Sequence, residues 1–262
     1  MMRALFTGTS GMRGQQFKID VTANNLANVN TTGFKADRAE FHDLLYQSMR
    51  RPGGTSATGI EWPVKLDVGL GVTPIATSKI FTQGSFIATD QPLDMVIAGD
   101  GFFKITDVDG GTIYTRDGSF KRDSEGNVVT NDGYYLDPAI TIPEDTIELV
   151  ITQDGTVNAT QPGQIEPTQL GQITLVRFVN PQGLTPLGDN RFAETGASGA
   201  PLEDIPGVNG LGSIRQGFLE NSNVSVVDEL VSLIIGQRAY EANSRSVQTS
   251  DEMLQTAVNL KR

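Results

Sequence analysis

The two ends of the chain carry apolar residues at every seventh position, and the segment between them lacks this pattern. These positions are Leu5, Met12, Ile19 and Leu26 near the start, and Val226, Leu233, Tyr240, Val247 and Leu254 near the end. A seven-residue apolar repeat aligns one stripe along a helix and favours packing against a helical partner. We therefore predict helices from about Arg3 to Asn28 and from about Val226 to Arg262, paired with each other as a coiled coil.

The middle of the chain predicts short antiparallel strands. Apolar runs at residues 93–98, 101–105, 112–115 and 127–130 alternate with Asp-Gly and Asn-Asp-Gly turns. Such turn signals at short, regular spacing are typical of antiparallel β structure. The predicted fold class is α+β and discontinuous: an antiparallel, β-rich body is inserted between two paired terminal helices.

We predict three domains from these patterns. Residues 1–35 and 226–262 form a terminal helical core domain, residues 36–90 and 206–225 a connecting β domain, and residues 91–205 an outer β domain. Within the connecting domain, Phe41, Leu44, Leu45 and Met49 have helical spacing and predict a short helix over 36–50. Residues 50–59 are rich in Gly and Pro, which predicts a surface loop.

Composition argues against catalysis. The chain of 262 residues has no Cys, which excludes thiolate metal sites and a Cys nucleophile. Its one histidine, His42, has no nucleophile motif nearby and cannot form a His-rich metal site alone. We therefore expect no enzyme activity, no catalytic residue, no cofactor and no bound metal.

Charge and hydropathy narrow the partners further. The formal net charge is −11, and the acidic excess lies in the middle of the chain rather than at its ends. An acidic body repels nucleic acid, so we expect no nucleic-acid partner. No apolar run approaches the ~18 residues that a membrane-spanning helix needs, and the opening residues are too polar and Gly-rich for a cleaved signal peptide. These features predict a cytoplasmic protein, unless export uses a route without a cleaved signal.

One motif at the end of the first predicted helix resembles a known family. Residues 23–35, ANNLANVNTTGFK, resemble the N-terminal signature of bacterial flagellar rod and hook proteins, and residues 231–255 resemble the C-terminal helix of that family. Segments 101–103, 114–120 and 212–224 extend the resemblance into the body, and together with the chain length they fit distal-rod members best. The signature residues are Ala23, Asn24, Asn25, Leu26, Ala27, Asn28, Thr31, Gly33, Phe34 and Lys35. Gly236 departs from expectation, because we would expect another residue inside the last helix.

The resemblance implies a structural subunit of the flagellar distal rod. Such a subunit joins a helical tubular polymer that transmits torque from motor to hook and encloses the export channel. The implied partners are copies of the chain itself, proximal rod and hook proteins, the surrounding P and L ring proteins, and the type III export apparatus, without direct membrane insertion. The implied location is the periplasmic rod of the basal body, reached without a cleaved signal peptide.

The resemblance also assigns roles to individual residues. The nine seven-spaced residues would make subunit contacts in the helical core. Residues 50–63 resemble an insertion specific to distal rods, in which Arg50, Pro52, Gly53 and Trp62 would pack between subunits and stiffen the rod. If so, the expected surface loop is instead a packed segment.

Two other functions stay open on the sequence. One is a hook-like or proximal-rod axial subunit of the same family. The other, from a different class, is a β-rich surface-binding module that uses its helices to form oligomers. Filament formation by the purified protein would favour an axial subunit, whereas a small closed oligomer that binds glycans would favour the binding module.

Overall fold

The computed structural model describes residues 2–50, 64–107, 110–164 and 166–259. The chain divides into two compact units, each assembled from separate stretches of sequence. The helical unit comprises Met1–Ala27, Asp37–Ser78 and Ser225–Arg262, and the β unit comprises Asn28–Ala36 and Lys79–Val224. Each unit is described by itself below.

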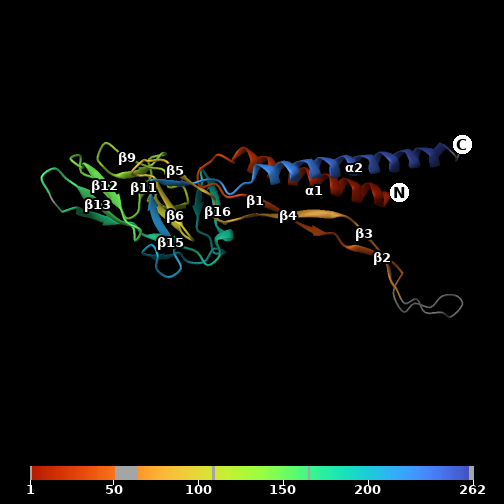
Figure 1. The fold of residues 1–262 in the computed structure, drawn as a ribbon. Coiled ribbons are helices and arrows are strands. Elements are labelled where there is room, and N and C mark those ends of the chain that lie inside the picture. The colour runs from red at the N-terminus through yellow and green to blue at the C-terminus, as the bar shows by residue number, and fades with distance from the viewer. Residues whose placement is uncertain (1, 51–63, 108–109, 165, 260–262) are drawn as a thin grey trace. The chain divides into compact units, whose positions relative to one another are not determined.

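Two long helices run side by side in the helical unit (Figure 1). Helix α1 spans Met2–Ala27 and α2 spans Val226–Asn259, which confirms the predicted terminal helices. They are antiparallel, because Gly8 of α1 lies against Val247 while Ile19 lies against Gly236. No helix in the described part of the chain is long and apolar enough to cross a membrane.

A β ribbon accompanies the helices in the same unit. Strand β1 (Asp37–Asp43) pairs with β4 (Val72–Lys79), and β2 (Tyr46–Arg50) pairs antiparallel with β3 (Leu66–Gly69). The predicted short helix over 36–50 is therefore wrong. The backbone of this segment is held in ladders with β3 and β4, and Phe41 packs edge-on against Phe17 of α1 at 6.4 Å between ring centroids. Contacts distant in sequence thus override a weak helical spacing.

The β unit contains short strands. Their bounds are β5 Phe86–Ala88, β6 Met95–Ala98, β7 Phe102–Thr106, β8 Thr112–Thr115, β9 Phe120–Arg122, β10 Val128–Thr130, β11 Tyr135–Leu136, β12 Glu148–Ile151, β13 Thr156–Thr160, β14 Thr168–Gln172, β15 Leu175–Arg177, β16 Thr185–Gly188, β17 Arg191–Ala193, β18 Leu202–Asp204, β19 Ser213–Gln216 and β20 Phe218–Glu220. A 3-10 turn, η1, covers Pro181–Gly183.

The strands pair antiparallel, as the turn spacing predicted. The largest sheet has the order β16-β17-β8-β7-β11-β10-β9, with β15 joining at β7 and β18 pairing with β15. Smaller sheets are β12-β13-β14, β19-β6 and β20-β5. With the two helices, this arrangement confirms an α+β fold in which a β-rich body is inserted between terminal helices.

The hydrophobic core lies in the β unit. One cluster centres on residues such as Ile97, Phe103 and Ile214, and a second on Phe102 and Phe192. All buried hydrophobic side chains among the described residues belong to this unit. The helical unit instead buries glycines and small polar residues, so its apolar side chains remain partly or largely open to solvent.

Candidate functional site: the helix pair and the motif residues

The contact between α1 and α2 is made at glycines. A Cβ added to Gly8 would lie 2.7 Å from Cγ2 of Val247, and one added to Gly236 would lie 3.0 Å from Cγ1 of Ile19. Each glycine therefore receives a branched side chain from the opposite helix. Gly236 is buried, so the residue that departed from expectation in the sequence is a point of close approach between the helices.

The nine seven-spaced residues border this contact. Leu5, Met12, Ile19, Leu26, Leu233, Val247 and Leu254 are half-buried, and Val226 and Tyr240 are exposed. In α2 the fully buried positions are Gly236 and Ser250, which form a second seven-spaced series with Glu229 and Asn243. Along α2 the apolar positions and these second positions alternate at intervals of three and four residues. This is the spacing of residues on the face of a helix that packs against a partner helix. A role for the nine residues in contacts between subunits stays a prediction.

Asn25 of the signature joins three elements at one end of the helix pair. Its amide nitrogen donates to the backbone oxygen of Asp37 at 2.9 Å and to Glu229 Oε1 at 3.0 Å, and its amide oxygen accepts from the Asp37 nitrogen at 2.8 Å. Asp37 begins β1 and Glu229 lies in the first turn of α2. A side chain with both a donor and an acceptor is required here, and an amide supplies both.

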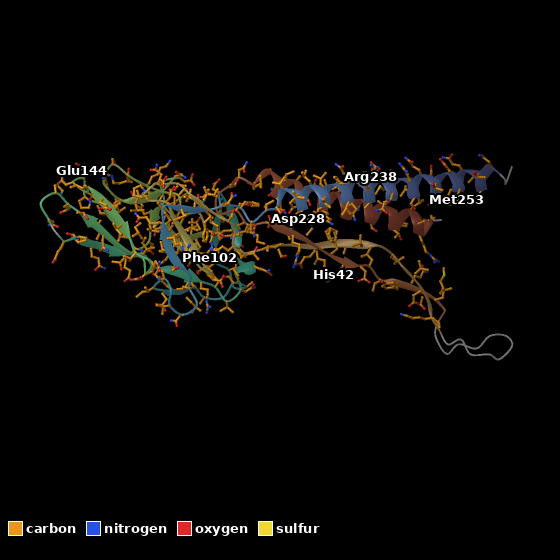
Figure 2. The ribbon with its side chains drawn as sticks, viewed as in Figure 1. His42, Phe102, Glu144, Asp228, Arg238 and Met253 are labelled. Carbon is orange, nitrogen blue, oxygen red and sulfur yellow. The ribbon has the colours of Figure 1, made fainter. Side chains whose placement is uncertain are left out.

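The face of α2 turned away from α1 carries an apolar stripe. Its members and exposed fractions are Val227 (70%), Leu230 (45%), Val231 (50%) and Ile234 (56%). Their i, i+3, i+4, i+7 spacing places them on one side of the helix. Figure 2 shows Asp228 near the start of α2, followed along the helix by Arg238 and Met253. We call the four apolar residues Val227, Leu230, Val231 and Ile234 the α2 stripe.

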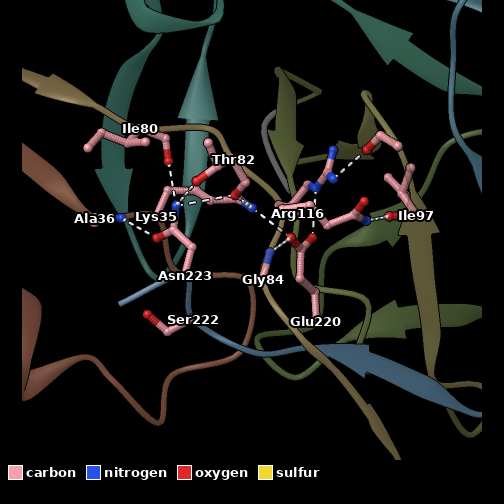
Figure 3. Close-up of polar contacts among 12 residues, drawn as sticks. Lys35, Ala36, Ile80, Thr82, Gly84, Ile97, Arg116, Glu220, Ser222 and Asn223 are labelled. Carbon is pink, nitrogen blue, oxygen red and sulfur yellow. Dashed lines mark hydrogen bonds and ion pairs between the residues drawn. The ribbon is translucent and has the colours of Figure 1, made fainter. Parts of the chain in front are cut away.

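The second half of the signature builds a buried charge cluster in the β unit. Lys35 Nζ lies 2.6 Å from Glu220 Oε1, and Arg116 Nε lies 2.9 Å from Glu220 Oε2 (Figure 3). All three side chains are almost fully withdrawn from solvent. The cluster joins three of the segments that resemble the family, because Lys35 closes the signature, Arg116 lies in 114–120 and Glu220 lies in 212–224.

Neutral groups complete the hydrogen bonding of these charges. Lys35 also donates to the Thr82 oxygen at 2.8 Å, and Arg116 donates to the backbone oxygens of Gly101 and Gly99, each at 2.5 Å. The Gly84 nitrogen donates to Glu220 Oε1 at 2.9 Å. A buried ion cluster stabilises a fold only when its polar atoms find such further partners, and each charged nitrogen and oxygen of this cluster has at least one partner.

Burial and the neighbouring charges shift the pKa values of Glu220 and Lys35. Burial alone would raise the pKa of Glu220, but the charges of Arg116 and Lys35 outweigh it and hold that pKa below its ordinary value. Burial lowers the pKa of Lys35, and the carboxylate of Glu220 opposes this effect. Glu220 is therefore ionised throughout the neutral range, where its carboxylate pairs with two buried cations, one at each oxygen.

Two further residues fix the backbone around the cluster. Asn223 accepts from the Ala36 nitrogen at 2.8 Å and donates to the Ile80 oxygen at 2.7 Å. Gly33 has φ +70°, and a Cβ there would lie 2.8 Å from the backbone nitrogen of Asp117. Glycine is therefore required at position 33 of the signature, both by conformation and by space.

The remaining signature residues lie nearer the surface. Phe34 is buried, Leu26, Asn28 and Thr31 are half-buried, and Ala23, Asn24 and Ala27 are exposed. Thr31 donates from its hydroxyl to Asn28 Oδ1 at 3.2 Å, within the turn that follows α1. The polar turn chemistry of the motif thus closes the helix, while Asn25 and Lys35 make its long-range contacts.

Sequence reasoning missed four residues of these sites: Gly8, Arg116, Glu220 and Asn223. The segments that contain the last three had been recognised as resembling the family, but no role had been given to any residue in them. The one signal for the charge cluster is Lys35 itself, which follows Gly33-Phe34 shortly before a strand. If such a lysine is buried, it needs an acidic partner, so its place in the signature could have pointed to a buried carboxylate.

The predicted rod-stiffening insertion is not tested. Pro52, Gly53 and Trp62 lie outside the described residues, and Arg50 is placed only as the last residue of β2. His42 is exposed on β1. Within the described ranges, no group of three or more His, Cys, Asp or Glu side chains could hold a metal ion.

Three family models match separate parts of the chain, all from flagellar axial proteins. They are the flagella basal body rod protein model over residues 5–35, the flagellar hook protein FlgE/F/G D1 domain over 96–159, and the flagellar basal body rod FlgEFG protein C-terminal model over 215–260. These matches define the class, a flagellar rod or hook subunit, and they cover the signature, part of the β body and α2.

Whole-length relatives narrow this class. The chain is 50% identical to the flagellar basal-body rod protein FlgG of Borreliella burgdorferi, with 100% of both chains covered, and 48% identical to that of Buchnera aphidicola subsp. Schizaphis graminum, covering 97% and 98%. Similarity to the hook protein FlgE of Helicobacter mustelae, 47% identical, covers 52% of this chain and 30% of that protein. The chain belongs to the FlgG family of flagellar basal-body rod proteins. It is a structural, non-enzymatic protein of the flagellar basal body.

Proposed function

We propose that this chain assembles with copies of itself into the distal rod, a helical tubular polymer that encloses the export channel and transmits torque from motor to hook. Its partners along the rod are the proximal rod proteins and the hook protein, and the P and L ring proteins surround it. It lies in the periplasm and arrives through the type III export apparatus without a cleaved signal peptide. It binds neither nucleic acid nor the membrane interior.

The observation that carries this proposal is the incompleteness of the helical unit. Its described residues include no buried hydrophobic side chain, yet α2 exposes the four-residue stripe along one face. Contiguous exposed apolar surface on a soluble protein marks an interaction site. Burying one such side chain contributes about 1.5–3 kcal/mol, so repeated contacts along a polymer would stabilise the helical unit substantially.

A single charge on the stripe tests the proposal. Ile234→Asp should block polymerisation, because it would bury an unpaired carboxylate between subunits. Ile234 is 56% exposed in the single chain, so the helices and the β unit should fold as before. Gln248→Asp is the matched control, since it adds the same charge at an exposed position farther along α2.

Sedimentation and electron microscopy of the purified proteins are the readouts, with circular dichroism as the check on folding. Wild-type chain and Gln248→Asp should form long tubes at high concentration, whereas Ile234→Asp should stay monomeric. Small closed oligomers of the wild type, or tubes formed equally well by Ile234→Asp, would refute assembly through this face.

A further inference from the structure

A groove of about 790 Å³ lies in the helical unit, between the N-terminal half of α1 and the β ribbon. Its lining is mostly apolar and includes Leu5, Phe6, Thr9, Leu44, Leu70 and Pro74. Phe6 is 71% exposed at this groove, which leaves a large aromatic surface in water. An apolar groove beside a helix is a common receptor for one face of an amphipathic helix.

A cation borders the groove. Arg13 is among its lining residues, and its side chain is exposed. Its guanidinium has no ion-pair partner among the residues that the structure describes. An occupant with an apolar face and a carboxylate at one end of that face would satisfy both the groove and this arginine.

The α2 stripe has this chemistry. The exposed carboxylate of Asp228 lies in the same first turns of α2 and has no ion-pair partner among the described residues. At its other end the stripe gives way to the surface ion pair of Arg238 with Glu241, at 3.2 Å. The stripe is therefore a short apolar face with an acid at its start.

The stripe cannot fill the groove of its own chain. It lies beside the C-terminal end of α1, where Asn25 contacts Glu229, whereas the groove is formed by residues 2–13 of α1. At ~1.5 Å per residue, roughly 20 Å of helix separates the two surfaces. The occupant must come from another molecule.

We propose that the groove of one copy receives the α2 stripe of a second copy, with Arg13 of the first paired to Asp228 of the second. This inference rests on the proposed function, because it names the contact through which the chain polymerises. The two surfaces lie on different parts of the helical unit, so the contact is head-to-tail. A head-to-tail contact that does not close on itself generates an open filament, as a rod requires.

Charge reversal tests the pairing of Arg13 with Asp228. Arg13→Glu and Asp228→Arg should each raise the critical concentration for polymerisation about tenfold, because each variant faces two like charges. The double variant restores opposite charges and should return to within about threefold of wild type. Both side chains are exposed, so folding of the monomer should not change. A double variant that polymerises worse than either single variant would overturn the pairing.

Cross-linking tests the contact itself, since the chain has no cysteine of its own. One protein carries Thr9→Cys in the groove, and a second carries Val231→Cys on the stripe. The two are mixed, polymerised and treated with a short bis-maleimide reagent. A cross-linked heterodimer should form in the polymer, and it should not form when the mixture is diluted to monomer before the reagent is added. Thr9→Cys mixed with Met253→Cys, exposed near the far end of α2, is the control.

The outcomes separate this inference from the proposed function. Tubes that form without a Thr9–Val231 cross-link, or that cross-link equally well to position 253, would refute the groove contact and leave rod assembly intact. If the wild type forms no polymer at any concentration, the proposed function itself fails.

Discussion

Gly236 of α2 lies directly against Ile19 of α1, with only 3.0 Å between Cγ1 of Ile19 and the position that a Cβ on Gly236 would take. Glycine lowers the intrinsic stability of a helix interior by about 1 kcal/mol relative to alanine. Here that loss is offset by a close contact between two helices whose unit has no fully buried hydrophobic side chain among its described residues.

Gly236→Leu should therefore separate the helices. Overpacking of this kind costs about 1–3 kcal/mol, and the loss should appear as earlier thermal melting of the helical signal in circular dichroism. Ile19→Ala removes the obstructing side chain, so the double variant should recover part of the lost stability. Gln237→Leu, at the adjacent exposed position, is the control and should melt like the wild type. Equal melting of Gly236→Leu and Gln237→Leu would contradict the close packing.

The helices could be predicted from the sequence, but the residues at their contact could not. The seven-residue spacing of Leu233 and the other apolar residues of the repeat predicts a helix face that packs against another helix, and these residues do border the contact. A glycine adds nothing to an apolar repeat, so the sequence alone suggests that Gly236 weakens the helix. In the structure the space that its side chain would fill is taken by Ile19. Sequence patterns report which side chains are apolar, whereas packing also depends on where side chains are missing.

In the β unit the sequence predicts features that depend on local turns, but not those that depend on contacts between distant residues. Asx-Gly turns are local signals, and they located strands such as β7 and β8 correctly. Segment 36–50 has a weak helical spacing, and the partners that hold it as strands, such as Gly69 opposite Tyr46, are distant in sequence and leave no local signal in the segment. The buried charge cluster was invisible for the same reason, since Lys35 and Glu220 are 185 positions apart.

Asn25 offers a sharp test of the junction between α1, β1 and α2. Asn25→Asp would remove two hydrogen-bond donors and place a carboxylate next to Glu229. We expect a loss of about 2–3 kcal/mol in the free energy of unfolding of the helical unit, measured by urea titration of the helical signal. Gln16→Glu, which adds a carboxylate at an exposed position of α1, should change it by less than about 0.5 kcal/mol. Similar losses in both variants would mean that the Asn25 contacts contribute little.

Replacing Lys35 tests how much its ion pair with Glu220 contributes to the stability of the β unit. Lys35→Met keeps the length of the side chain but leaves Glu220 Oε1 without its 2.6 Å partner. Breaking one partner of a buried ion pair costs about 3–5 kcal/mol, so the β unit should unfold at clearly lower urea concentration. A double variant, Lys35→Met with Glu220→Gln, should be more stable than the sum of the two single losses indicates, because it leaves no unpaired carboxylate. Strict additivity would argue against direct coupling of the pair.

The insertion near residues 50–63 remains a prediction with one supporting feature. Strands β2 and β3, which lead into and out of it, expose Tyr46, Met49 and Leu66. We expect Trp62, the sole tryptophan, to fluoresce at solvent-like wavelengths in the monomer and to shift to the blue on polymerisation, with reduced quencher access. Deleting residues 52–61 should still permit polymerisation but give a more flexible, hook-like rod. An unchanged spectrum in verified polymers would exclude the insertion from the subunit contacts.

Glu220 makes the stability of the β unit dependent on pH. Its pKa in the folded state is held below the ordinary value of 4.5, so the unfolded chain takes up the proton first as the pH falls. The stabilising contribution of the carboxylate is therefore complete above about pH 4.5 and is lost as the pH drops further, through the folded-state pKa.

Glu220→Gln should isolate this contribution. At pH 7 the variant should be less stable than the wild type in urea unfolding, because it loses the negative charge that pairs with Arg116 and Lys35. Below pH 4.5 the difference should shrink, because the unfolded wild-type chain takes up a proton at Glu220 first and the folded carboxylate follows below its lower pKa. Glu203→Gln is the matched control: it removes a carboxylate from the partly exposed pair with Lys104, at 3.1 Å, and should cost less than about 1 kcal/mol. A Glu220→Gln deficit that stays constant from pH 7 to pH 3 would show that the residue stabilises the fold by shape and hydrogen bonding rather than by charge.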